Sequence, residues 1–184
     1  MPRMTVNERP VEFDLDPRTP LLFALREAAN LTGTKSCGSG NDCIGAACTV
    51  IIDGTALRSC RVSLAEAEGR YVTTIEGLSR DRSHPVQQAM VAEQAIQCGF
   101  CTPGMVMAAA ALIERNPAPS REEIEAAVPN LCRCGVYPRL VRAIERAGRV
   151  ARRRESLSAA PAPGISAEDA AQAVPALRAP ARDQ

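Results

Sequence analysis

The stretches QCGFCTPGMV (residues 97–106) and NLCRCGVYPR (residues 130–139) decide the fold of this chain. Each contains a close pair of cysteines, and the segment between them has the apolar periodicity of two helices. Two close thiol pairs on either side of a helical segment are typical of a metal site with four thiolate ligands. We therefore expect a metal centre built from Cys98, Cys101, Cys132 and Cys134.

A second group of four cysteines precedes this region. Cys37, Cys43 and Cys48 lie on a glycine-rich loop, and Cys60 follows a predicted hairpin with its turn at Asp53-Gly54. Glycines let backbone N–H groups turn toward thiolate or sulfide charge. The set resembles the ligands of a plant-type [2Fe-2S] ferredoxin. Four cysteines also suit tetrahedral zinc, so a zinc-stabilised binding module is the alternative, although the uneven loop favours a cluster.

The composition fits a globular protein and bears on its partners. The residues are 46% hydrophobic but only 3% aromatic, so aliphatic side chains must build the core. A net charge of +1 provides no long-range field to attract nucleic acid or anionic lipid. No run approaches the roughly 20 apolar residues of a membrane span, and the chain does not start with an apolar export segment. We expect a cytoplasmic subunit, with co-export to the periplasm on a partner that carries the signal as the alternative.

The cysteine pattern favours metal over disulfides. Eight cysteines could form a disulfide-framed extracellular protein, but nothing in the sequence marks secretion, and close cysteine pairs in a reducing compartment are more often metal ligands. Bond-making catalysis is not expected, because His84 is the single histidine and no Ser/His/Asp or Cys/His set can form. We expect His84 to be a surface or helix-capping residue, and the sequence contains no dinucleotide or phosphate-binding loop.

The order of predicted elements indicates an α+β fold, with strands first and helices second. In the first part we expect a hairpin, a helix over 20–29 capped by Thr19, and further strands. These strands are predicted at 49–52, at 57–60 and in the stretch from residue 71. In the second part we expect helices starting near His84, over 103–114, after a capping box of Ser120 and Glu123, and at Pro138.

Two features of this region have ordinary interpretations. Met105 and Met107 are expected to fill the core rather than bind metal. Beyond residue 150 the chain becomes rich in Arg, Ala and Pro. Our hypothesis is that this tail lies along a partner, with Arg152, Arg153 and Arg154 meeting acidic groups; a solvated basic patch is the alternative.

With these residues in place, the chain resembles the small iron–sulfur subunit of the molybdenum hydroxylases, the xanthine oxidase and aldehyde oxidoreductase family. QCGFCTPGMVM and NLCRCGVYPRLV resemble the second-cluster signature of that family, and PLLFALREAANLTGTK and CTVIIDG resemble its first-domain segments. The form CRCG-x-Y is similar to the isoquinoline-oxidoreductase-like branch. The resemblance implies a β-grasp ferredoxin-like domain over 1–76, a four-helix [2Fe-2S] domain over 77–150, and an extended tail over 151–184.

The resemblance also implies a function. A large partner subunit holds a molybdopterin cofactor and hydroxylates an aldehyde or N-heterocycle with water. This chain carries the electrons away singly through two [2Fe-2S] clusters to an external acceptor, such as a flavin or cytochrome c subunit. Gln97 and Cys134 match the positions at which the family approaches the pterin. The helical-domain cluster is then the one nearest molybdenum.

One segment departs from the family pattern. Family members space the first-cluster ligands C-x4-C-x2-C, whereas Cys37, Cys43 and Cys48 are spaced C-x5-C-x4-C. The interval from Cys48 to Cys60 is that of the family. Four thiolates are still available, so we assign them to the first cluster, and the longer loop is expected to change the hydrogen bonds and solvent access around it.

Overall fold

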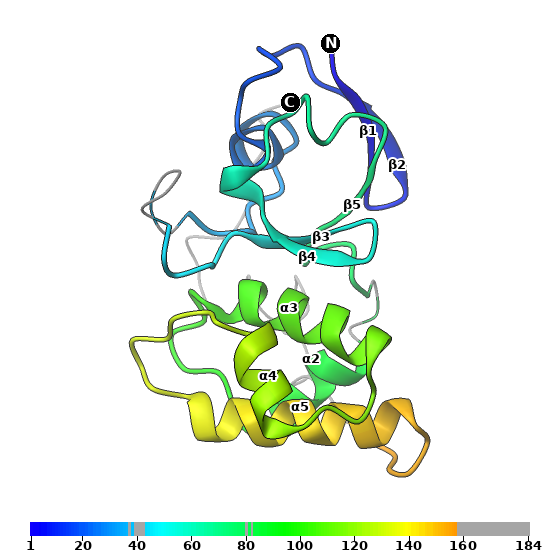
Figure 1. Ribbon diagram of the computed structural model, residues 1–184, viewed down its shortest axis with the longest axis vertical. Helices are drawn as coiled ribbons and strands as arrows, with labels where there is room; N and C mark the ends of the chain where they lie inside the picture. The colour runs from blue at the N-terminus through cyan, green and yellow to red at the C-terminus, as the bar shows by residue number, and fades with distance from the viewer. Residues whose placement is uncertain (37, 39–42, 80, 82, 158–184) are drawn as a thin grey trace, which may run out of the picture.

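The computed structural model describes residues 1–36, 38, 43–79, 81 and 83–157. Within these ranges a layer of strands lies against a layer of helices (Figure 1). Cys37 and the segment 158–184 lie outside the described residues, so the predictions for the tail beyond Leu157 lie outside them too. None of the helices in the described ranges is long and apolar enough to cross a membrane.

The strand layer is a five-stranded sheet with the order β2-β1-β5-β3-β4. Strands β1 and β5 are parallel, and the other neighbours are antiparallel. The strands are β1 (Arg3–Val6), β2 (Arg9–Glu12), β3 (Thr49–Ile52), β4 (Thr55–Arg58) and β5 (Tyr71–Thr73). The predicted hairpin turn at Asp53-Gly54 is present, and both residues have the positive φ that a two-residue turn requires.

Strand β3 is buried on both faces. Val50 and Ile52 point into the core between the sheet and the first helical segment, where Met4, Leu21 and Leu25 also lie. On the opposite face, Ile51 packs with Met107, Ala110 and Ala111 of helix α3 (Thr102–Arg115). Successive residues of a strand point to opposite faces, so β3 joins the two layers of the molecule.

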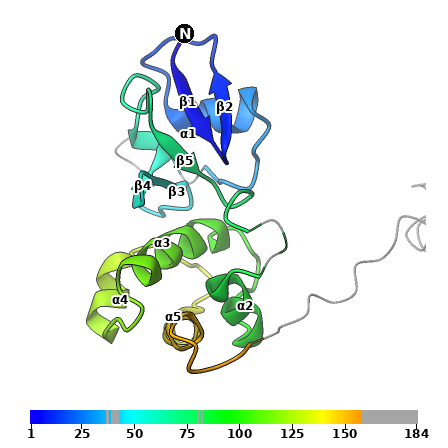
Figure 2. The same cartoon turned by 90° about the vertical axis from the view of Figure 1, so that its right-hand side faces the viewer.

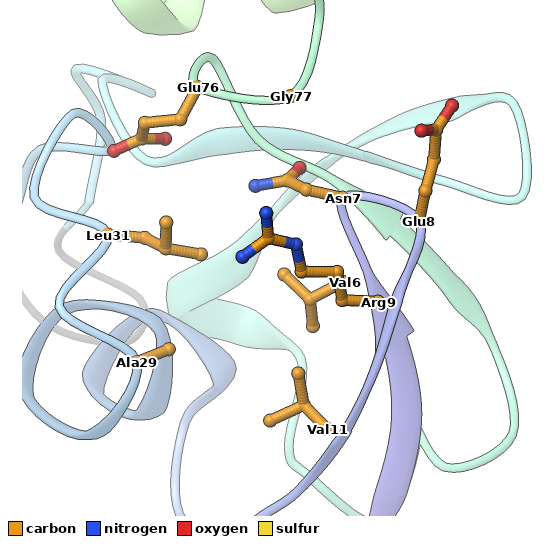
Figure 3. A pocket seen from close by; sticks show the side chains of 9 residues that line it. All are labelled: Val6, Asn7, Glu8, Arg9, Val11, Ala29, Leu31, Glu76 and Gly77. Carbon is orange, nitrogen blue, oxygen red and sulfur yellow. The ribbon is translucent and has the colours of Figure 1, made fainter.

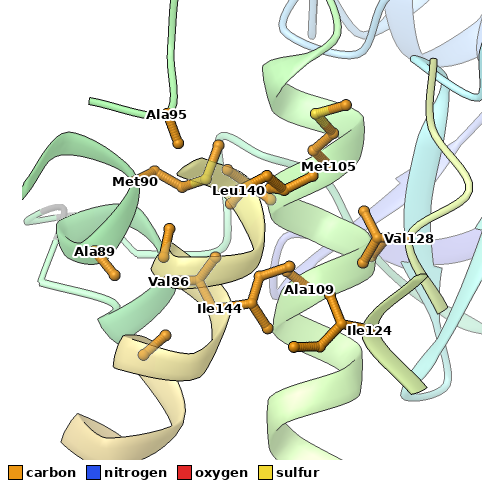
Figure 4. Close-up of a cluster of buried hydrophobic side chains, with 14 of the residues drawn as sticks. Val86, Ala89, Met90, Ala95, Met105, Ala109, Ile124, Val128, Leu140 and Ile144 are labelled. Atoms are coloured by element: carbon orange, nitrogen blue, oxygen red, sulfur yellow. The ribbon is translucent and has the colours of Figure 1, made fainter. Parts of the chain in front are cut away.

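The helical layer is arranged around α3. Every residue from Gly104 to Ile113 is buried, because the sheet covers one side of α3 and three other helices cover the rest (Figure 2). Met105 and Met107 are fully buried core residues, as predicted. The other helices are α2 (Pro85–Ala92), α4 (Arg121–Ala127) and α5 (Tyr137–Ala151). Figure 4 shows their contacting side chains, which include Val86, Met90, Ile124 and Ile144.

Two helix caps agree with the sequence. The predicted capping box is present, since Glu123 N–H donates to Ser120 Oγ and the Glu123 carboxylate accepts from Ser120 N–H. His84 caps α2, because its ring nitrogen Nδ1 accepts from Val86 N–H at 3.2 Å.

Several boundaries were predicted wrongly. Thr19 does not cap the first helix: the cap residue is Pro20, and the N–H of Leu21 donates to Val62 O instead. That helix consists of a short α1 (Leu21–Phe23) and a π-helical turn η1 (Ala24–Ala28). The two-residue turn pairs Ile52 with Thr55, so Arg58 pairs with Thr49, the first residue of β3. The returning strand β4 therefore ends at Arg58.

Two further features concern Cys60 and the end of helix α2. Cys60, which was predicted on the returning strand, lies in the 3-10 turn η3 (Ser59–Arg61). The helix predicted to start near His84 ends at Ala92, and Gln94 just beyond it adopts a left-handed φ of 50°.

Candidate metal centres

Three cysteines of the first group form a compact buried cluster. Cys43 and Cys48 are fully buried and Cys60 is 7% exposed. The Sγ atom of Cys48 lies 3.4 Å from that of Cys43 and 3.4 Å from that of Cys60. All three sulfur atoms lie within 4.8 Å of one another. Cys37, the fourth predicted ligand, lies outside the described residues.

The backbone around these cysteines is held by nearby polar groups. Arg58 donates from Nη1 to Cys43 O at 2.8 Å, and Ser59 donates from both its N–H and its hydroxyl to Cys48 O. These bonds fix the cysteines from two directions, across the hairpin and along the loop. The fold therefore holds the backbone of Cys43 and Cys48 in place.

Burial raises the pKa of the Cys48 thiol to about 11; hydrogen bonds from the Cys60 backbone and the Cys43 thiol oppose the shift, whereas the Cys60 thiol adds to it. A thiol with so high a pKa stays protonated at neutral pH unless a cation displaces its proton. The separations of 3.4 Å are far longer than the roughly 2.05 Å of a disulfide bond, so these thiols are not bonded to each other. Buried thiols held this close together fit a metal or an iron–sulfur cluster.

The second group brings its two sequence segments together. Cys101 and Cys132 are buried, whereas Cys98 and Cys134 are exposed. Cys101 interacts with Cys132, and Cys98 interacts with Cys134, so each pair takes one thiol from each segment. Among the described residues, only the first group places three ligand atoms within 4.8 Å of one another. The second group therefore has one hydrogen-bonded thiol pair inside and one at the surface, and charge interactions also join Cys98 to Cys101 and Cys132 to Cys134.

The pKa values of this group differ because their surroundings differ. Burial, together with the neighbouring Cys132 thiol, raises the pKa of Cys101 to about 12. Burial also raises the pKa of Cys132, but the backbone N–H of Val136, the Cys101 thiol and the N–H groups of Cys134 and Gly135 lower it more. Its net pKa is therefore below the usual value. Such a ring of N–H groups stabilises a thiolate.

The pKa of the exposed Cys134 depends mainly on its interactions with Cys98. A hydrogen bond from the Cys98 backbone lowers the pKa of Cys134, whereas the Cys98 thiol and loss of solvation raise it, and the net shift is upward. Two helices begin beside these thiols: Cys101 is the cap residue of α3, and α5 starts three residues after Cys134. Their positive ends favour negative charge on bound thiolates and sulfide.

Gln97 and Cys134 line one pocket of about 260 Å³ at the surface. Arg139 and Arg142, on the first turns of α5, line the same pocket. The sequence did not single out these two arginines, although their position just after the cysteine pair could have suggested them. The pterin contacts of Gln97 and Cys134 stay a prediction.

Large apolar side chains surround the exposed cysteine pair in the sequence and are themselves exposed. Ile96 and Phe100 flank Cys98, and Leu131 and Tyr137 flank the second pair. Tyr137 also accepts, through its hydroxyl oxygen, a hydrogen bond from Cys132 N–H at 2.7 Å. Exposed apolar residues gathered around a polar site are typical of a protein–protein contact.

A separate pocket of about 530 Å³ lies beside the β1–β2 turn and does not involve the described cysteines (Figure 3). Its polar residues have structural tasks. Asn7 exchanges two hydrogen bonds with Thr74, and Glu76 accepts from Gly33 N–H and from the Thr74 hydroxyl. This pocket is therefore separate from the described cysteines, and its polar side chains hold the strands and loops together.

Comparison with known proteins identifies this chemistry. Residues 74–145, which contain all four cysteines of the second group, match the family described as a [2Fe-2S] binding domain. One of the subunits of nicotinate dehydrogenase from Pseudomonas putida is 51% identical over 153 residues, covering 82% of this chain and 96% of that protein. The alpha subunit of isoquinoline 1-oxidoreductase from Brevundimonas diminuta is 47% identical over 149 residues, covering 79% of this chain and 96% of that protein.

A solved structure agrees with this result. A chain in the crystal structure of quinoline 2-oxidoreductase from Pseudomonas putida 86 is 40% identical and superposes with a TM-score of 0.75. The match covers 84% of this chain and 96% of that chain. Fold and cysteine sites together define an iron–sulfur protein with a [2Fe-2S] binding domain. The chain belongs to the small iron–sulfur subunits of the molybdenum hydroxylase family, and its role in the oxidoreductase complex is electron transfer.

Proposed function

We propose that the chain holds two [2Fe-2S] clusters and carries single electrons from a molybdopterin-containing partner subunit to a separate acceptor. The observation that carries the proposal is that the fold brings cysteines from distant segments into thiol–thiol contact twice. Cys48 meets Cys60 across the β3–β4 hairpin, and Cys101 meets Cys132 between the starts of α3 and α5. When bound, each cluster accepts and releases one electron.

The ligand sets follow the two groups. The first cluster is held by Cys37, Cys43, Cys48 and Cys60, and the second by Cys98, Cys101, Cys132 and Cys134. The paired arrangement of the second set supports a two-iron cluster, because each iron of a [2Fe-2S] cluster takes two of the four thiolates.

The second centre is the one that faces the partner. Its outer thiols are exposed, and exposed apolar residues that a partner would cover flank them in the sequence. Gln97 and Cys134 on the surface pocket are the proposed pterin contacts, and the Arg139 guanidinium on that pocket adds positive charge for an anionic group of the cofactor. Electrons then continue to the first centre and leave toward a flavin or cytochrome c subunit.

The names of the relatives indicate a substrate class. Nicotinate dehydrogenase and isoquinoline 1-oxidoreductase are named for N-heteroaromatic compounds, so we propose that the complex oxidises a compound of that kind. The proposed domains are a β-grasp ferredoxin-like domain over 1–76, a four-helix [2Fe-2S] domain over 77–150, and a partner-bound tail over 151–184. The proposed compartment is the cytoplasm.

Iron and acid-labile sulfide analysis, combined with EPR after dithionite reduction, tests this proposal. Two clusters require about four iron and four sulfide per chain, and two distinct EPR signals are expected. Zinc in place of iron, in a colourless protein, would establish the zinc-stabilised module instead. A protein with neither metal nor titratable thiols would establish the disulfide-framed alternative.

A further inference from the structure

Two hydrogen bonds connect the two cysteine sites directly. Asn130 donates from Nδ2 to Ala46 O at 2.7 Å, and Leu131 donates from its N–H to Gly45 O at 3.1 Å. Asn130 and Leu131 immediately precede Cys132, whereas Gly45 and Ala46 lie between Cys43 and Cys48. The link therefore joins two segments separated by more than 80 residues, each of which adjoins one cysteine site.

Asn130 contributes little to stability by this bond. Its side chain is 1% exposed, and Oδ1 is buried without a hydrogen-bond partner among the described residues. Leaving a buried carbonyl oxygen unsatisfied costs at least as much free energy as one hydrogen bond contributes. Ala46 O does not depend on Asn130 either, because it also accepts from Thr49 Oγ1 at 2.7 Å and from Thr49 N–H at 3.1 Å.

The residues around these two hydrogen bonds are tightly packed. A Cβ at Gly104, in the first turn of α3, would lie only 2.5 Å from Ala46 O and 2.9 Å from Asn130 Nδ2. Ala46 adopts a left-handed φ of 51°, which is unfavourable for a residue with a side chain. A strained residue in a tightly packed place indicates that its exact position is maintained at a cost in stability.

We propose that Asn130 is a positioning residue which, with Leu131, forms the route for electrons between the two cysteine sites. This inference rests on the proposed function, since it requires a cluster at each site. The route runs from Cys132 through the Leu131 N–H to Gly45 O, and along the backbone to Cys43. One electron crosses it in each event, and no bond is made or broken. Hydrogen-bonded contacts transmit electrons better than gaps, because tunnelling weakens steeply with distance through space.

The chain offers a matched pair of variants. Asn130→Ala removes the side-chain hydrogen bond that positions Leu131 N–H against Gly45 O, and Asn130→Asp removes the same donor without leaving a cavity. Thr49→Val is the control, because it removes a hydrogen bond of the same length to the same Ala46 carbonyl but leaves the link intact. All three variants are prepared as the full chain with iron and sulfide loaded.

Three readouts are compared. A single electron is delivered by pulse-generated methyl viologen radical, and its redistribution between the two EPR signals is followed by freeze-quenching. We expect redistribution to slow several-fold in both Asn130 variants and to keep the wild-type rate in Thr49→Val. In the fully reduced proteins, the magnetic splitting between the two clusters should change only in the Asn130 variants. Hydrogen exchange at the Leu131 amide should accelerate in the same two proteins.

Other outcomes are decisive as well. An unchanged redistribution rate in both Asn130 variants, with both EPR signals intact, would overturn the route. Loss of either signal in both variants would place Asn130 in a cluster site rather than between the sites, which also overturns it. A wild-type chain that binds no clusters would instead overturn the proposed function, and iron analysis identifies that case separately.

Discussion

Replacing Gly104 by alanine has two opposing effects on the free energy of unfolding, and the typical size of each is known. In a helix, alanine is favoured over glycine by at most about 1 kcal/mol, so the sequence alone would predict stabilisation. The structure predicts the reverse. The added Cβ would lie 2.5 Å from Ala46 O, 2.9 Å from Asn130 Nδ2 and 3.0 Å from Ala47 Cα. Two of these atoms belong to the backbone and cannot rotate away.

The sizes of these two effects decide whether the free energy of unfolding rises or falls. Overpacking in a close-packed interior costs about 1–3 kcal/mol, and the backbone contacts place this site toward the upper end. The net loss in the free energy of unfolding is therefore about 1–2 kcal/mol. For a folded region of this length, we expect the melting temperature to fall by about 2–8 °C.

Urea unfolding of the full chain, followed by far-UV circular dichroism, measures this loss. Gly148→Ala is the matched control, because its Cβ would meet Pro117 O in the helical layer rather than the loop of the first cysteine group. Both variants should be destabilised, but only Gly104→Ala should change the magnetic interaction between the clusters. A Gly104→Ala protein as stable as the wild type would show that the loop does not lie against α3.

Three further predictions concern separate parts of the chain. Ser120→Ala removes the capping box of α4 and should lower the free energy of unfolding by about 1 kcal/mol, measured by urea midpoint, whereas an unchanged midpoint would show that the cap is not formed in solution. Cys132→Ser should abolish one of the two EPR signals and stop substrate-dependent reduction of the other, and normal reduction of the remaining cluster would show that the series order is wrong. Arg146, followed by Arg149, holds the pKa of Glu155 below its ordinary value of 4.5, so this carboxylate stabilises the fold above pH 4.5 and the effect is lost as the pH falls further, through the lowered folded pKa. Glu155→Gln should flatten that part of the stability curve in acid titrations monitored by circular dichroism, and a wild-type pH dependence in the variant would exclude this ion pair as its source.

Much of the fold could be predicted because its signals are local. The apolar period of α3, the Ser120 capping box and the Asp53-Gly54 turn depend on residues close together in the sequence. The family resemblance was confirmed by the relatives and by the solved structure. The grouping of cysteines into two sets followed from their spacing.

The remaining features depend on contacts that spacing does not encode. Thr19 failed as a cap because a distant carbonyl, Val62 O, already accepts from the N–H of Leu21. The association of Cys98 with Cys134, and of Cys101 with Cys132, depends on how α3 and α5 approach each other. The Asn130 link required knowing that the loop of one site packs against the helix that begins at the other.

Strand β3 has a consequence for protein engineering. Val50 and Ile52 pack into one hydrophobic core and Ile51 packs into another, so the strand forms part of both cores. Cutting the chain between its strands and helices would leave Ile51 and the facing side of α3 open to water. A redesigned electron carrier that uses either centre alone would need new polar residues where Ile51 and α3 now meet. Moving both centres together to a new partner keeps that contact buried.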